Sequence, residues 1–135
     1  MRVLPLINQS LKIKKIMRSL FFLLVLTIVF SCSNPSDQLI GKWTATAIIQ
    51  DNEALDIDLE AVSFTFQDNS TYEFTSTLDY REAGAFQVSD NMLITKDTIN
   101  GQGQKSVMIK QLDSDTLKLR MKNPAGWMEV TLAKE

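Results

Sequence analysis

The sequence contains no histidine and a single cysteine, Cys32, among its 135 residues. Without histidine the chain cannot use Ser-His-Asp or Cys-His catalysis, form a zinc site with histidine ligands, or switch with pH through an imidazole. One cysteine excludes an intramolecular disulfide and every metal site built from several cysteines. We therefore expect one modest domain whose hydrophobic core is sufficient without disulfides.

Acidic residues are absent from the first part of the chain. Residues 1–31 carry five basic residues and no acid, so the remainder holds nine basic and all sixteen acidic residues, a net charge of −7. This asymmetry indicates two segments that function in different environments, with a boundary near Cys32.

An apolar run at residues 20–30 follows Arg18 and ends in Val29-Phe30-Ser31-Cys32. The run is too short to cross about 30 Å of hydrocarbon as a helix, which needs about 20 residues, and predicts an export signal. Met17 could begin this signal as well as Met1, with the same mature protein. The four residues resemble a bacterial lipobox, which implies that residues 1–31 are a signal peptide and that Cys32 is acylated.

The lipobox resemblance also implies an address in the cell envelope. Ser33 after the cysteine implies transport to the outer membrane, with the protein facing the periplasm. We expect residues 32–38 to form a lipidated polar tether that supplies reach rather than structure, and folding to begin near Leu39. The alternatives are a buried, inert Cys32 and plain secretion.

Period-two alternation dominates from Lys42 onward, and turn residues interrupt it at short intervals, which predicts an all-β antiparallel domain. The Asn100-Gly101 pair predicts a type I′ hairpin, because both central residues of that turn have positive φ. No helix of usable length is expected. The eight predicted strands cover residues 42–50, 61–67, 71–78, 85–89, 92–99, 105–112, 116–122 and 127–133.

Eight sequential strands joined by short turns favour an up-and-down barrel over residues 39–135, because closure removes exposed sheet edges. A barrel of this size is filled by its own side chains or holds one small ligand. A two-sheet sandwich would use the same strands and remains the alternative.

Gly41-Lys42-Trp43 at the start of the first strand resembles the Gly-x-Trp motif of lipocalins, and the strand count agrees with that fold. The resemblance implies that Trp43 closes one end of the barrel, that Gly41 permits a tight entry of the backbone, and that a late basic residue, here Lys134, packs on the tryptophan. The chain resembles the small lipocalin-like domains of Bacteroidetes lipoproteins more than it resembles the secreted carrier lipocalins. The Thr-Asp-Tyr motif, the disulfide and the carboxy-terminal helix of carrier lipocalins are missing.

Alternation also predicts which side chains point inward. This set is either a filled core or the lining of a pocket for an apolar or amphipathic ligand, with the Tyr72 hydroxyl orienting a polar end. Beyond the candidate ligand-binding residues, the inward set includes Trp43, Ile49, Val62, Val88, Leu117 and Leu132. The candidates are Ala45, Ala47, Phe64, Phe66, Tyr72, Phe74, Phe86, Leu119, Met121, Met128 and Val130.

Two charged segments could be either binding sites or ordinary solvated surface. Five acids between Asp51 and Glu60 could select cationic ligands at the mouth of the barrel or bind calcium, but they lack the spacing of a calcium loop, and a solvated loop, strand or lid is favoured. Lys118, Arg120 and Lys122 form a basic stripe, which is either a site for anionic phospholipid or nucleic acid or, as favoured here, an ordinary solvated strand face. The net charge of the domain and its exported address argue against nucleic acid as its partner.

We expect no metal, no cofactor and no enzymatic activity, because no carboxylate pair has a context suited to acid–base chemistry. The first hypothesis is a membrane-anchored, non-enzymatic lipoprotein that binds a small hydrophobic or amphipathic ligand. The alternative is a filled barrel that acts as a protein–protein interaction or inhibitor module in the envelope, for which exposure of Ile48, Met108 or Trp127 would be a sign.

Overall fold

The computed structural model describes residues 13–17, which are helical, and residues 33–135. The chain divides into two compact units, Met1–Cys32 and Ser33–Glu135. The predicted export run and Cys32 lie outside the described residues. Among the residues that are described, no helix is both long enough and apolar enough to cross a membrane.

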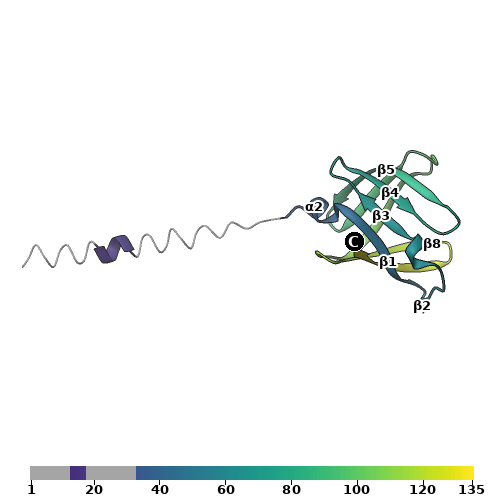
Figure 1. Ribbon diagram of the computed structural model, residues 1–135, viewed down its shortest axis with the longest axis horizontal. Helices are drawn as coiled ribbons and strands as arrows, with labels where there is room; N and C mark the ends of the chain where they lie inside the picture. Colours follow the sequence, from purple (N-terminus) through teal and green to yellow (C-terminus); the bar gives the residue numbers. More distant parts are fainter. Residues whose placement is uncertain (1–12, 18–32) are drawn as a thin grey trace, which may run out of the picture. The chain divides into compact units, whose positions relative to one another are not determined.

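The second unit consists of strands with two short helical turns (Figure 1). Its elements are α2 (Pro35–Leu39), β1 (Gly41–Gln50), β2 (Glu53–Ala54), the 3₁₀ turn η1 (Leu59–Ala61), β3 (Ser63–Phe66), β4 (Thr71–Thr75), β5 (Arg81–Ser89), β6 (Met92–Asp97), β7 (Gly103–Leu112), β8 (Thr116–Asn123) and β9 (Gly126–Lys134).

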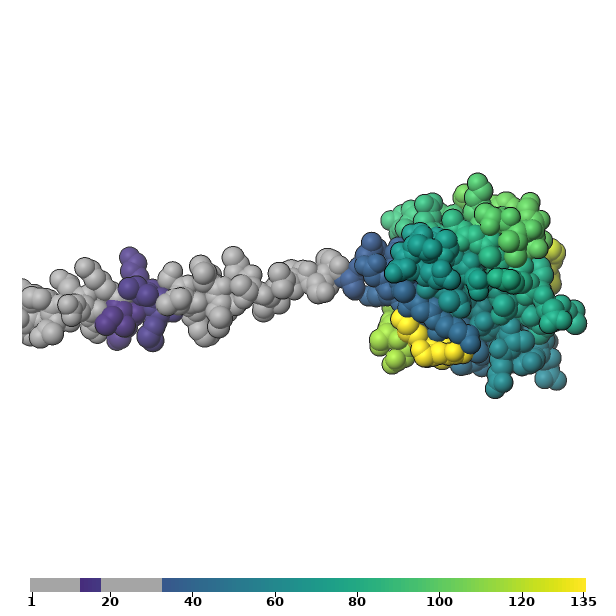
Figure 2. Space-filling view, turned by 45° about the horizontal axis from the view of Figure 1, so that its top comes forward, coloured from purple at the N-terminus to yellow at the C-terminus, as the bar shows by residue number. Residues whose placement is uncertain are grey.

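The sheet closes on itself as a barrel. Each strand from β3 to β8 pairs antiparallel with the next, β1 pairs with β3, and β9 returns to pair with β1. In Figure 2 the yellow C-terminal residues lie against the blue β1 along this seam. The two-residue β2 only extends the end of β1. The eight-stranded barrel is therefore confirmed, and the sandwich alternative is wrong.

Two predicted connections differ in the structure. Gly101 has a φ of 67°, but Asn100 is not in the positive-φ region, so the predicted type I′ turn is wrong. A longer loop instead follows Asp97, whose carboxylate accepts hydrogen bonds from the backbone N–H groups of Ile99 and Asn100. The strand predicted at 85–89 begins earlier, at Arg81, and this extension brings Glu82 into the barrel.

A β-bulge in β1 reverses part of the predicted inward face. The register with β9 shifts between Ala45 and Ala47, so Ile48 is buried and Ile49 is 39% exposed. One additional residue moves every later side chain to the opposite face of the strand. The prediction that Ile49 points inward is therefore wrong, and Ala47 is only half-buried.

The start of the domain packs against one end of the barrel. Residues expected to form only a tether instead include α2, which Asn34 caps by accepting a hydrogen bond from Ser36 N–H. Leu39 at the end of α2 is fully buried, and its carbonyl accepts a 2.8 Å hydrogen bond from Trp43 Nε1. This end of the barrel is consequently closed.

Lys134 covers the tryptophan, as the lipocalin resemblance implies. Its Nζ lies 5.2 Å from the centre of the fully buried Trp43 ring, within range of a cation–π interaction. Gly41 has a φ of 129°, and a Cβ atom at this position would lie 2.8 Å from Lys134 Cε. The backbone conformation therefore requires glycine here, and an added Cβ would also displace the end of the Lys134 side chain.

Candidate functional site

The barrel interior is filled at the end closed by Trp43 and hollow toward the other end. The hollow is a cavity of about 220 Å³, large enough for a small organic molecule. Leu55 and Ile57, from the connection between β1 and η1, line it and are each 38% exposed, so the cavity reaches the surface beside the acidic segment.

Apolar side chains from most of the strands form the cavity walls, with four polar side chains among them. The apolar lining consists of Ile48, Leu55, Ile57, Val62, Phe64, Phe74, Leu93, Val107, Met121, Met128 and Val130. Ser76, Glu82, Thr95 and Lys105 are the polar members.

The candidate binding residues from the sequence separate into two groups. Phe64, Phe74, Met121, Met128 and Val130 line the cavity. The others do not: Ala45, Phe66, Tyr72, Phe86 and Leu119 are buried in the filled part of the barrel, and Ala47 lies after the bulge. The interior is thus partly core and partly cavity.

Glu82 is the centre of a polar cluster at the edge of the cavity. It is only 5% exposed, and its carboxylate accepts hydrogen bonds from the hydroxyl groups of Tyr72 (3.2 Å) and Tyr80 (2.6 Å). Lys105 Nζ completes the cluster with a direct ion pair to the same carboxylate. Burying a carboxylate is costly unless it is paired and hydrogen-bonded in this way.

Both tyrosines remain hydrogen-bond donors across the physiological pH range. Burial raises the pKa of Tyr72 to about 12, and the negative charge of Glu82 adds to the shift. The hydrogen bond to Glu82 raises the pKa of Tyr80 to about 12, with a smaller contribution from burial. Neutral hydroxyls therefore hold the carboxylate in a fixed orientation.

Sequence reasoning missed Glu82 and Lys105 as site residues, although period-two alternation contains the signal. Glu82 occupies the same face of β5 as the inward Phe86, and Lys105 occupies the same face of β7 as Val107. A charged residue in phase with inward apolar residues is unusual, because such positions are normally apolar. The predicted strand that started at Ala85 removed Glu82 from this pattern.

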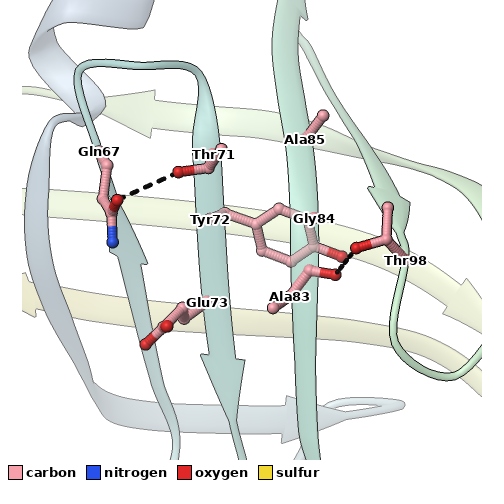
Figure 3. A pocket seen from close by; sticks show the side chains of 8 residues that line it. All are labelled: Gln67, Thr71, Tyr72, Glu73, Ala83, Gly84, Ala85 and Thr98. Carbon is pink, nitrogen blue, oxygen red and sulfur yellow. Dashed lines mark hydrogen bonds between the residues drawn. The ribbon is translucent and has the colours of Figure 1, made fainter.

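Further hollows lie on the outer surface of the barrel. Figure 3 shows one over β4 and β5, where the Thr71 hydroxyl donates to Gln67 and the Thr98 hydroxyl donates to the Ala83 carbonyl. Glu73 and Tyr72 are paired with residues outside the hollow, Arg81 and Glu82. Across residues 13–17 and 33–135, no group of three or more His, Cys, Asp or Glu side chains is placed to hold a metal ion.

Another of these hollows lies beside Trp127, which is 47% exposed. Arg120 from the basic stripe stacks on this ring with Cζ 4.6 Å from the ring centre. Another stripe residue, Lys118, forms a 3.7 Å ion pair with Glu129. Of the three residues whose exposure would indicate an interaction surface, Ile48 is buried and Trp127 is exposed.

Comparison with known proteins supports the same fold. Residues 39–119 match the model of the lipocalin-like domain family. A lipocalin-like protein from Bacteroides uniformis has a similar structure, with a TM-score of 0.55 and 15% identity over 73% of this chain and 99% of that one. An uncharacterized protein from Bacteroides eggerthii gives a TM-score of 0.51 and 12% identity over 72% and 99% of the two chains.

No match is found among curated proteins. The family match nevertheless covers more than half of the chain, from the residue that plugs the closed end of the barrel to the middle of β8. Together with the closed eight-stranded sheet, it shows that this chain belongs to the family of lipocalin-like domains.

Proposed function

We propose that this protein is a non-enzymatic, membrane-anchored lipoprotein whose barrel binds a small hydrophobic or amphipathic molecule. The observation that carries the proposal is the cavity of about 220 Å³, which is walled by apolar side chains and has one polar cluster at its edge. Small-molecule sites have this composition, in which apolar surface provides affinity and a few polar groups orient the ligand.

The volume of the cavity limits the size of the ligand. If each non-hydrogen atom occupies roughly 30 Å³, the space of a water molecule in the liquid, the cavity holds about seven such atoms. A long fatty acyl chain would exceed this volume. The proposal is therefore restricted to compact ligands or to the short apolar end of a larger molecule.

A series of linear alcohols from butan-1-ol to decan-1-ol tests this proposal by calorimetry on the chain Ser33–Glu135, which contains every strand of the closed barrel. Each added methylene should tighten binding about fourfold, the equivalent of about 0.8 kcal/mol, until the cavity is full near hexan-1-ol.

A matched pair of variants locates the binding. Val107→Phe adds volume inside the cavity and should weaken binding at least tenfold, whereas Gln87→Phe adds it on the exposed face of β5 and should have little effect. Absence of saturable binding, or equal binding by both variants, would contradict the proposal.

The proposed lipid anchor would orient the barrel. The chain enters the domain through α2 at the end closed by Trp43, away from the cavity. Acylation at Cys32 would attach the closed end to the membrane and leave the cavity open to the surrounding compartment, for which we propose the periplasmic side of the outer membrane. Cys32→Ser should move the protein from the membrane fraction to the soluble fraction, and persistence in the membrane fraction would refute the anchor.

Exposure of Trp127 favours a second candidate function, interaction with another envelope protein. A photo-crosslinking residue at position 127 should then give one defined adduct in cells, and the same residue at the outward position 131 should not. Equal labelling from both positions would remove this candidate.

A further inference from the structure

The ion pair at the edge of the cavity is asymmetric in its exposure. The Glu82 side chain is 7% exposed, whereas that of Lys105 is 42% exposed. Two tyrosine hydroxyls hold the carboxylate: that of the buried Tyr72, at 3.2 Å, and that of Tyr80 in the connection between β4 and β5, at 2.6 Å. Lysine carries its charge on a flexible, strongly hydrated chain, so Lys105 can move into water while Glu82 cannot.

Glu82 needs a cationic partner whenever water is displaced from the cavity, because a buried carboxylate without one is strongly unfavourable. An anionic ligand would compete with Glu82 for Lys105 and would introduce a second negative charge beside it. An uncharged ligand would leave the ion pair unchanged and use only the apolar walls. A ligand ammonium could replace the Lys105 ammonium at the same carboxylate.

Resting on the small-molecule function proposed above, we propose that the cavity selects hydrophobic primary amines, with Glu82 binding the ligand ammonium and Lys105 occupying that position when the barrel is empty. The alkyl chain of the amine extends along the apolar walls. Lys105 is released to the surface when the ligand enters.

Aromatic side chains form the wall of the cavity beside Glu82. Phe74 lies directly opposite Glu82 in the pairing of β4 with β5, and its ring is 4.5 Å from that of Phe64. Tyr80, which donates to Glu82, packs edge-on against Phe74 at 6.2 Å. The alkyl chain of an amine bound at the carboxylate can therefore pack against these aromatic rings.

The rim of the cavity has the charge that would attract such a ligand. Residues 51–60 contain five exposed acids and no base, and Asp79 adds another in the connection between β4 and β5. Leu55 and Ile57 link this acidic segment to the cavity itself. A negative rim above an apolar cavity raises the local concentration of cations and accelerates their entry.

Three probes of seven non-hydrogen atoms test the proposal by calorimetry on Ser33–Glu135 at pH 7 and low salt: hexylamine, hexan-1-ol and pentanoate. An alkylamine is fully protonated at this pH. Hexylamine should bind at least tenfold more tightly than hexan-1-ol, and pentanoate should bind more weakly than either. Val107→Phe should weaken hexylamine binding, which separates binding in the cavity from attraction to the acidic rim.

Two variants test the roles of the ion pair. Lys105→Met removes the lysine ammonium that competes with the ligand for Glu82, so it should increase the preference for hexylamine over hexan-1-ol. Added hexylamine should also raise the melting temperature of this variant more than that of the wild type. Glu82→Gln should abolish the preference for the amine. If Glu82→Gln does not fold, the double variant with Lys105→Met leaves no unpaired buried charge and should show the same loss.

The outcomes distinguish this inference from the function on which it rests. If hexan-1-ol binds as tightly as hexylamine and Lys105→Met does not change the ratio, amine selection is refuted and the small-molecule site remains. If none of the three probes binds the folded wild-type domain, both proposals are refuted.

Discussion

Replacing Gly41 by alanine should destabilise the closed end of the barrel through two separable effects. At a φ of 129° the backbone conformation is accessible essentially only to glycine, which corresponds to about 1–3 kcal/mol of strain for alanine. The new Cβ would also lie 2.8 Å from Lys134 Cε, closer than a stable contact allows. Because the lysine side chain is flexible, it should move away and lose its contact with the Trp43 ring.

Loss of the cation–π contact adds about 0.5–2 kcal/mol, so the total cost of Gly41→Ala should be about 1.5–5 kcal/mol. A double-mutant cycle with Lys134→Ala separates the two effects. In the double variant the backbone strain persists, but the contact is already absent. The double variant should therefore be less destabilised than the sum of the single variants, by about 0.5–2 kcal/mol.

Urea unfolding of Ser33–Glu135, followed by circular dichroism, measures the four free energies of unfolding. Circular dichroism is preferable to fluorescence, since Trp127 would contribute to the fluorescence signal as well as Trp43. A cost below about 0.5 kcal/mol for Gly41→Ala would refute the strain argument. Strict additivity in the cycle would refute the contact between Lys134 and the tryptophan.

Three further predictions concern stability. Gly84→Ala should lower the free energy of unfolding, measured in urea, by about 3 kcal/mol because its Cβ would collide with the Lys96 carbonyl oxygen. The control Gly101→Ala, whose Cβ meets no atom within 4 Å, should lower it by about 1 kcal/mol. Similar losses in the two variants would contradict the close approach of β5 and β6. Leu39→Ala should cost about 2–5 kcal/mol because the side chain is fully buried, and a cost under about 1 kcal/mol would show that α2 is not part of the core. The Tyr72 pKa is about 12 in the folded protein against 10.0 for the free side chain, so the folded state holds the phenol proton more tightly than the unfolded state does. The contribution of Tyr72 to the free energy of unfolding should therefore be complete below pH 10 and be lost toward pH 12, a fall on the order of 2–3 kcal/mol. Tyr72→Phe should reduce this fall, and parallel pH profiles of the two proteins would refute the prediction.

The sequence determined the architecture because its information was local and repeated. Alternation placed all eight barrel strands, and the polar turns between them set a meander that can close only if the last strand meets the first. Gly41 and Trp43 marked the closed end because tight backbone entry and a large buried ring are encoded by single residues. The resemblance to lipocalin-like domains was therefore visible before the fold.

Side-chain direction was predicted correctly only where strands were regular. Ile49 was assigned to the interior because strict alternation has no means of anticipating a bulge, and the bulge lies in the pairing of β1 with β9. Pairing of this kind depends on residues far away in the sequence. One displaced residue was enough to reverse the assignment of Ile48 and Ile49.

Only the tertiary structure decided that the interior is partly hollow and that its edge carries an ion pair. Glu82 and Lys105 lie on β5 and β7, and they meet across the inward face of β6, where Thr95 lies opposite Lys105. Whether a barrel is filled depends on the summed side-chain volumes of all strands at each level, a quantity that no local pattern contains. The sequence thus defined the walls and the closed end, and the closure of the sheet decided what those walls enclose.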